Sequence, residues 1–100
     1  MSRYYILDDE KHVVPVNDID DWTEMFKSSS RFVGRAEIGD VTVSTVFLGL
    51  DHQYGEGPPL LFETMIFGGP LDKSMWRYSS WDDAETGHKA AVRKVRKIPL

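Results

Sequence analysis

Residues 31–50, RFVGRAEIGDVTVSTVFLGL, decide the fold of this 100-residue chain. The stretch is rich in β-branched and apolar residues, and Gly39-Asp40 interrupts it with a pair suited to a tight hairpin turn. It therefore predicts two antiparallel strands. The far end of the second strand, Val41–Leu50, is apolar on both faces, which predicts a central strand covered on both sides.

Further strands are predicted on both sides of this hairpin. Leu60–Phe67 predicts a third strand, which the breaker residues 68–70 end. Near the N-terminus, Tyr4–Leu7 and His12–Val16 predict another hairpin with a polar turn at residues 8–11. Pro15 cannot donate to a strand ladder, so it places the second of these strands at an edge or ends it.

Two segments carry the three- and four-residue spacing of helices. In NDIDDWTEMFKSSS, residues 17–30, the apolar residues share one helical face and Asp18 is placed to cap the helix. The last segment begins with Ser80 and Asp83, a pair similar to a capping box, and Pro99 stops it. Its apolar stripe consists of Trp81, Ala84, His88, Ala91, Val95 and Ile98.

The predicted order of elements is ββαβββα. We therefore expect a single α+β domain over residues 1–100, with an antiparallel sheet of about five strands whose apolar face is covered by the two helices. The chain has no cysteine, which excludes disulfides, thiolate zinc sites and cysteine nucleophiles. No run approaches the ~20 apolar residues of a membrane span, and the N-terminus does not read as a signal peptide, so we expect a cytoplasmic protein.

Charge is distributed unevenly along the chain. Five basic residues and no acid lie between residues 89 and 97. The first 88 residues, with 7 bases against 16 acids, therefore have a net charge of −9, whereas the whole chain has a net charge of −4. The basic cluster suits the C-terminal end of a helix. A double-stranded-RNA-binding domain would need bases at the start of the last helix, where Asp82, Asp83 and Glu85 stand. Nucleic acid is therefore not the expected partner.

The predicted loop Asp51–Pro59 is longer than the ~2–5 residues of an ordinary hairpin connection. Long loops on a rigid sheet often carry function, so we expect His52, Tyr54 and Glu56 to contact a partner. The alternative is a solvated connection without a role. One imidazole and two carboxylates fall short of a zinc site, and we expect neither metal nor cofactor.

The segment MWRYSSW, residues 75–81, concentrates the residue types that dominate binding hot spots. Trp76, Arg77 and Tyr78 are therefore further candidate partner-binding residues. The alternative for these aromatic side chains is packing against the core.

His88 lies on the apolar face of the last helix, which predicts a half-buried histidine held by a hydrogen bond. Glu63 interrupts an apolar strand and needs a partner, for which Arg35, Arg77 and His88 are candidates. A buried polar pair of Glu63 and His88 is one possibility. No nucleophile is evident beside either residue, and we assign no catalytic residue.

Two segments of the chain resemble a family of small uncharacterised proteins encoded by tailed phages and prophages. They are VSTVFLGLDHQYGEGPPLLFETMIFGGPLD (43–72) and RYSSWDDAETGH (77–88). The resemblance implies a phage accessory protein. Small acidic phage proteins often antagonise host defence by binding a host complex or by sequestering a signalling molecule.

We therefore expect a protein that acts by binding. The leading hypothesis is a phage-encoded inhibitor, similar to anti-CRISPR or other anti-defence proteins, that binds a host protein or complex. A second hypothesis is a small-ligand sponge or small enzyme that uses His52, Glu63 and His88. A third is a phage structural or regulatory subunit that self-associates.

Overall fold

The computed structural model describes residues 4–28, 31–51 and 56–99. It confirms the α+β class and the predicted order of elements, with one further strand before the last helix. The elements are β1 (Tyr4–Leu7), β2 (Val13–Val16), α1 (Ile19–Ser28), β3 (Phe32–Ile38), β4 (Val41–Phe47), β5 (Phe62–Phe67), β6 (Met75–Tyr78) and α2 (Trp81–Arg96).

The strands form two antiparallel sheets and not the single sheet that the sequence predicted. β1 pairs with β2, and the other four strands form a sheet in the order β3-β4-β5-β6. The chain turns away from the larger sheet after Phe47, so β4 ends before the predicted Leu50. Gly49 has a left-handed φ of 74°, and a Cβ there would lie 2.6 Å from the Phe26 ring. Its carbonyl oxygen accepts a 2.8 Å hydrogen bond from the Tyr5 N–H, which ties β1 to this turn.

The main core lies between α2 and one face of the four-stranded sheet. Strand alternation places every second residue of β4 in this core, so these residues are buried and the residues between them are partly exposed. The buried residues of β4 are Val41, Val43, Thr45 and Phe47. The prediction that this strand is covered on both sides is wrong, since α2 packs on one face and α1 packs on β1 and β2.

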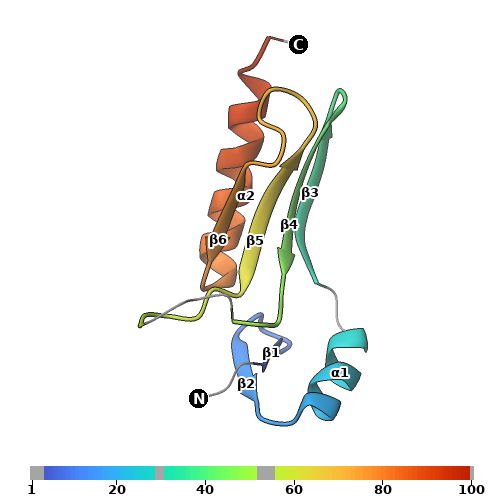
Figure 1. Ribbon diagram of the computed structural model, residues 1–100, viewed down its shortest axis with the longest axis vertical. Helices are drawn as coiled ribbons and strands as arrows, with labels where there is room; N and C mark the ends of the chain where they lie inside the picture. The colour runs from blue at the N-terminus through green and yellow to red at the C-terminus, as the bar shows by residue number, and fades with distance from the viewer. Residues whose placement is uncertain (1–3, 29–30, 52–55, 100) are drawn as a thin grey trace.

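Residues 4–28, which comprise β1, β2 and α1, form an N-terminal lobe beyond the ends of β3 and β4 (Figure 1). A continuous chain of aromatic rings joins this lobe to the sheet and to the start of α2, with successive centroids 4.8 to 6.3 Å apart. The rings are those of Tyr4, Trp22, Phe26, Phe47, Phe62 and Trp81. Neither α1 nor α2 has the length and hydropathy required to cross a lipid bilayer.

Candidate functional site

The predicted recognition loop is only partly within the described residues. His52 and Tyr54 lie outside them, and Glu56 is exposed. At the base of the loop, a carboxylate oxygen of Asp51 accepts a 3.1 Å hydrogen bond from the Leu60 N–H. The contact role of His52, Tyr54 and Glu56 stays a prediction.

The aromatic segment forms β6, and strand alternation divides its three candidate residues between two faces. Trp76 and Tyr78 pack against the core beneath α2, and the Tyr78 ring covers Gly87 so closely that a Cβ there would overlap it. Arg77 lies on the opposite face. The three side chains therefore do not form one contact surface, and packing accounts for the two aromatic rings.

Glu63 and His88 also lie on opposite faces of the sheet, so the suggested pair of these residues is wrong. Register places Glu63 directly opposite Arg77, and its Oε2 accepts a 3.1 Å hydrogen bond from Arg77 Nε. Glu63 alternates away from α2, whereas His88 projects from α2 onto the inner face. The ion pair with Arg77, one of the partners considered, satisfies the carboxylate.

His88 ends a chain of three hydrogen-bonded side chains in the core. Its Nδ1 is 2.7 Å from Thr45 Oγ1, which is 2.6 Å from Thr64 Oγ1. Burial lowers the pKa of His88. Both threonines are fully buried, so their hydroxyls do not meet a substrate, and the chain holds α2 on the sheet. Sequence reasoning missed these threonines, although two inward-facing threonines on neighbouring apolar strands are a usable signal.

A concave surface that combines polar and apolar groups lies on the N-terminal lobe, between the β1–β2 hairpin and α1. This open groove has a volume of about 600 Å³. Its floor is apolar, because Ile6 and Val14 are cross-strand partners and Val16 lies two residues further on the same face. Met25 of α1 contributes a side chain that is 46% exposed. Partly exposed apolar side chains thus gather in one depression.

Three carboxylates, one from the residue that caps α1 and two from α1 itself, line the same groove. Asp18, Asp21 and Glu24 recur every three residues and therefore share one side of the helix. Asp18 also caps α1, since its Oδ1 accepts hydrogen bonds from the N–H groups of Asp20 (2.8 Å) and Asp21 (3.2 Å). The sequence predicts Asp18 as a helix cap but does not predict the groove, which depends on contacts between distant residues. The N-terminal lobe contains seven acids and two lysines, a net charge of −5.

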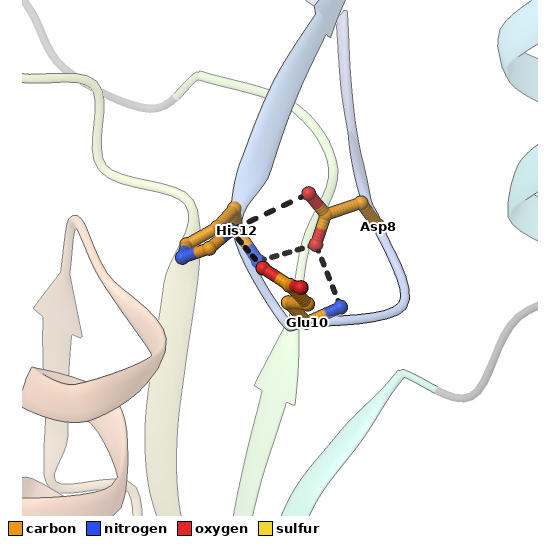
Figure 2. A network of polar contacts seen from close by, with 3 residues as sticks. All are labelled: Asp8, Glu10 and His12. Atoms are coloured by element: carbon orange, nitrogen blue, oxygen red, sulfur yellow. Dashed lines mark hydrogen bonds and ion pairs between the residues drawn. The ribbon is translucent and has the colours of Figure 1, made fainter.

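A polar network at the β1–β2 turn fixes the hairpin that forms one wall of the groove (Figure 2). Asp8 Oδ1 accepts 2.9 Å hydrogen bonds from the backbone N–H groups of Glu10 and His12, and the His12 bond lowers the pKa of Asp8. His12 Nδ1 lies 3.4 Å from the other oxygen of Asp8. Lys11 Nζ is 5.1 Å from the ring centroid of Trp81, which joins the turn to α2. These contacts fix the turn end of the hairpin.

Within residues 4–28, 31–51 and 56–99, no three His, Asp or Glu side chains are arranged to hold a metal ion. The groove offers an apolar floor and carboxylates, which is the chemistry of a binding surface. Comparison with known proteins finds no matching family model, no similar curated protein and no similar solved structure.

Proposed function

We propose that this protein acts by binding, as a phage-encoded accessory protein that inhibits a host defence complex by occupying a basic, partly apolar segment of it. The observation that carries the proposal is the groove of the N-terminal lobe, where Asp18, Asp21 and Glu24 line an apolar depression. The phage context rests on the family resemblance of residues 43–72 and 77–88.

The groove defines the chemistry of its partner. Apolar side chains of the partner would displace water from Ile6, Val14, Val16 and Met25, and flanking lysines or arginines would meet the carboxylates. The net charge of −5 on the lobe would speed encounter with a basic surface. Clustered Lys and Arg are the mark of nucleic-acid-binding proteins, which supports a target of that class.

The alternative of a small enzyme or ligand sponge has less support. It requires that at least two of His52, Glu63 and His88 converge on one pocket. Glu63 and His88 lie on opposite faces of the sheet, and each has a partner within the protein.

A peptide-binding experiment tests the proposal. The probe is a fluorescein-labelled amphipathic peptide of lysine and leucine, compared with versions in which glutamine or glutamate replaces lysine. We expect Asp21→Asn and Glu24→Gln each to weaken binding of the lysine peptide by about two- to fivefold, the size of a partly exposed ion pair. Asp40→Asn, an exposed acid in the β3–β4 turn, is the matched control and leaves binding unchanged.

Two outcomes of this titration contradict the proposal. Equal binding of the lysine and glutamine peptides would show that the carboxylates do not contribute. Equal losses for Asp21→Asn and Asp40→Asn would show that net charge alone attracts the peptide.

A capture experiment with lysate of the phage host extends the test to a natural target. The tagged protein and an Asp21→Asn, Met25→Gln double variant are compared after nuclease treatment. Met25 is already 46% exposed, so its replacement should leave the fold intact. A nuclease-resistant partner that the variant no longer retains supports the proposal, whereas equal retention by both proteins contradicts it.

A further inference from the structure

The four-stranded sheet has a second face that α2 does not cover, which we call the open face. Three of its large apolar side chains are unusually exposed for residues inside strands: Phe32 (53%), Phe67 (47%) and Met75 (44%). Isolated surface apolar residues are ordinary, but a group of them on one flat sheet face marks an interaction surface. Of the two helices in the described residues, α2 packs on the other face and α1 contacts only β1 and β2 among the strands.

Strand register orders the open face into three rows across the sheet. The first row contains Phe32, Val46, Glu63 and Arg77. The second row contains Arg35, Ser44, Met65 and Met75. The third row contains Glu37, Thr42 and Phe67. Apolar and small side chains therefore run along one diagonal, and the charged side chains occupy the two opposite corners.

The two charged corners are matched in chemistry. One corner holds Arg35 and Glu37, whose side chains are 3.3 Å apart, and the other holds the Glu63–Arg77 pair. The four strands thus present two arginines and two glutamates on this face, with no net charge, on a protein whose N-terminal lobe carries −5. A strongly charged partner would gain nothing from such a face, whereas an identical face is complementary to it.

We propose that the open face binds a second copy of this chain, with a two-fold axis along the apolar diagonal. Rotation about this axis lays the strands of one copy across the strands of the other, because it exchanges the direction along the strands with the direction across the sheet. These directions span similar lengths, about 13 Å for four residues along β4 and about 14 Å for three strand spacings. Arg35 then faces Glu63 of the other copy, and Glu37 faces its Arg77.

The resulting contact is an orthogonal packing of two sheets, a known arrangement for sheet faces about 10 Å apart. The three rows span only about 13 Å by about 14 Å, a small footprint beside the ~800 Å² per partner of a standard interface. The dimer is therefore expected to be weak and to depend on protein concentration. It uses none of the residues that line the groove, so it stands independently of the proposed function.

Sedimentation velocity of the full chain tests the association between about 5 µM and about 500 µM, a range suited to a weak interface. We expect the weight-average sedimentation coefficient to rise with concentration. Met75→Lys should abolish the rise, whereas Met25→Lys, at nearly the same exposure (46% against 44%) but on the N-terminal lobe, should preserve it. A monomer at every concentration would overturn the proposal and leave the face to a partner of other chemistry.

A charge exchange tests the assignment of the axis. The double variant Arg35→Glu, Glu37→Arg keeps the net charge and the ion pair within each copy, and both side chains are exposed (59% and 68%). It places like charges opposite Glu63 and Arg77 of the other copy, so we expect loss of the dimer. Association equal to that of the wild type would overturn this geometry.

Cross-linking gives an independent measurement, because the chain contains no cysteine. Ser44 lies close to the proposed axis, and Thr42 lies two residues along the same strand and away from it. A short bismaleimide linker should join two copies of the Ser44→Cys protein and should leave Thr42→Cys monomeric. Circular dichroism confirms that both variants fold, and cross-linking of Thr42→Cys alone would overturn the proposal.

Discussion

Replacing Thr45 by valine is predicted to destabilise the protein through the hydrogen-bonded chain that ends at His88. The hydroxyl of Thr45 is fully buried and stands between Thr64 Oγ1 at 2.6 Å and His88 Nδ1 at 2.7 Å. Thr45→Val keeps a similar shape and removes both hydrogen bonds. The hydroxyl of Thr64 and the ring nitrogen of His88 then remain without this partner.

The magnitude follows from the burial of the two orphaned groups. An unsatisfied polar group that is fully buried costs about 1–3 kcal/mol, and Thr64 is in this class. His88 is only partly buried, so the cost of losing its hydrogen bond lies within the ~0.5–1.5 kcal/mol of an ordinary hydrogen bond. We expect a total of about 2 kcal/mol, which lowers the Tm of a domain of this size by about 8–16 °C.

Urea denaturation and thermal melting of four proteins measure this effect: the wild type, Thr45→Val, Thr64→Val and the double variant. The double variant removes the orphaned hydroxyl of Thr64, so it should be more stable than Thr45→Val by about 1 kcal/mol. A change in stability of less than about 0.5 kcal/mol for Thr45→Val would contradict this prediction. So would a cost of the double variant equal to the sum of the two single costs.

Three further predictions concern the same sheet and helix. Burial lowers the pKa of His88, so the NMR shift of its Cε1 proton should report a titration below about pH 6.5. Stability should fall as the pH drops below that value, because the unfolded chain then binds a proton that the folded protein does not. A folded pKa at or above 6.5 would contradict this prediction. Gly87→Ala should destabilise the protein by about 1–3 kcal/mol, although alanine has the better helix propensity, because the new Cβ would overlap the Tyr78 ring. A raised Tm of this variant would contradict the prediction. Glu63→Gln should cost about 1 kcal/mol in urea denaturation, since the ion pair with Arg77 is partly buried, and an unchanged unfolding midpoint would show that this pair contributes nothing.

Local chemistry made much of the fold predictable. The β3–β4 hairpin turns at Gly39-Asp40 as expected, and Ser80 caps α2 by accepting a 3.1 Å hydrogen bond from the Asp83 N–H. Asp18 caps α1 in the same way. Each of these features depends on residues at most four positions apart, which a sequence displays directly.

The remaining features depend on residues that are distant in the sequence. β6 has only four residues, and its Trp-Arg-Tyr composition is typical of a contact surface, although its alternation also fits a strand. The separation of β1–β2 from the larger sheet, and the groove beside α1, depend on where α1 lies. The packing of Trp22 against Tyr4 and the 2.9 Å hydrogen bond from Trp22 Nε1 to the Tyr5 carbonyl set that position.

A ¹H–¹⁵N NMR titration of the full chain with the lysine–leucine peptide shows directly whether the groove of the N-terminal lobe binds it. We expect saturable shift changes to concentrate on β1, β2 and α1, with the largest at Val14, Asp21, Glu24 and Met25. Substitution of glutamine for lysine in the peptide should weaken these changes. Shift changes that centre on the open face or on α2, or their absence at millimolar peptide, would contradict the claim.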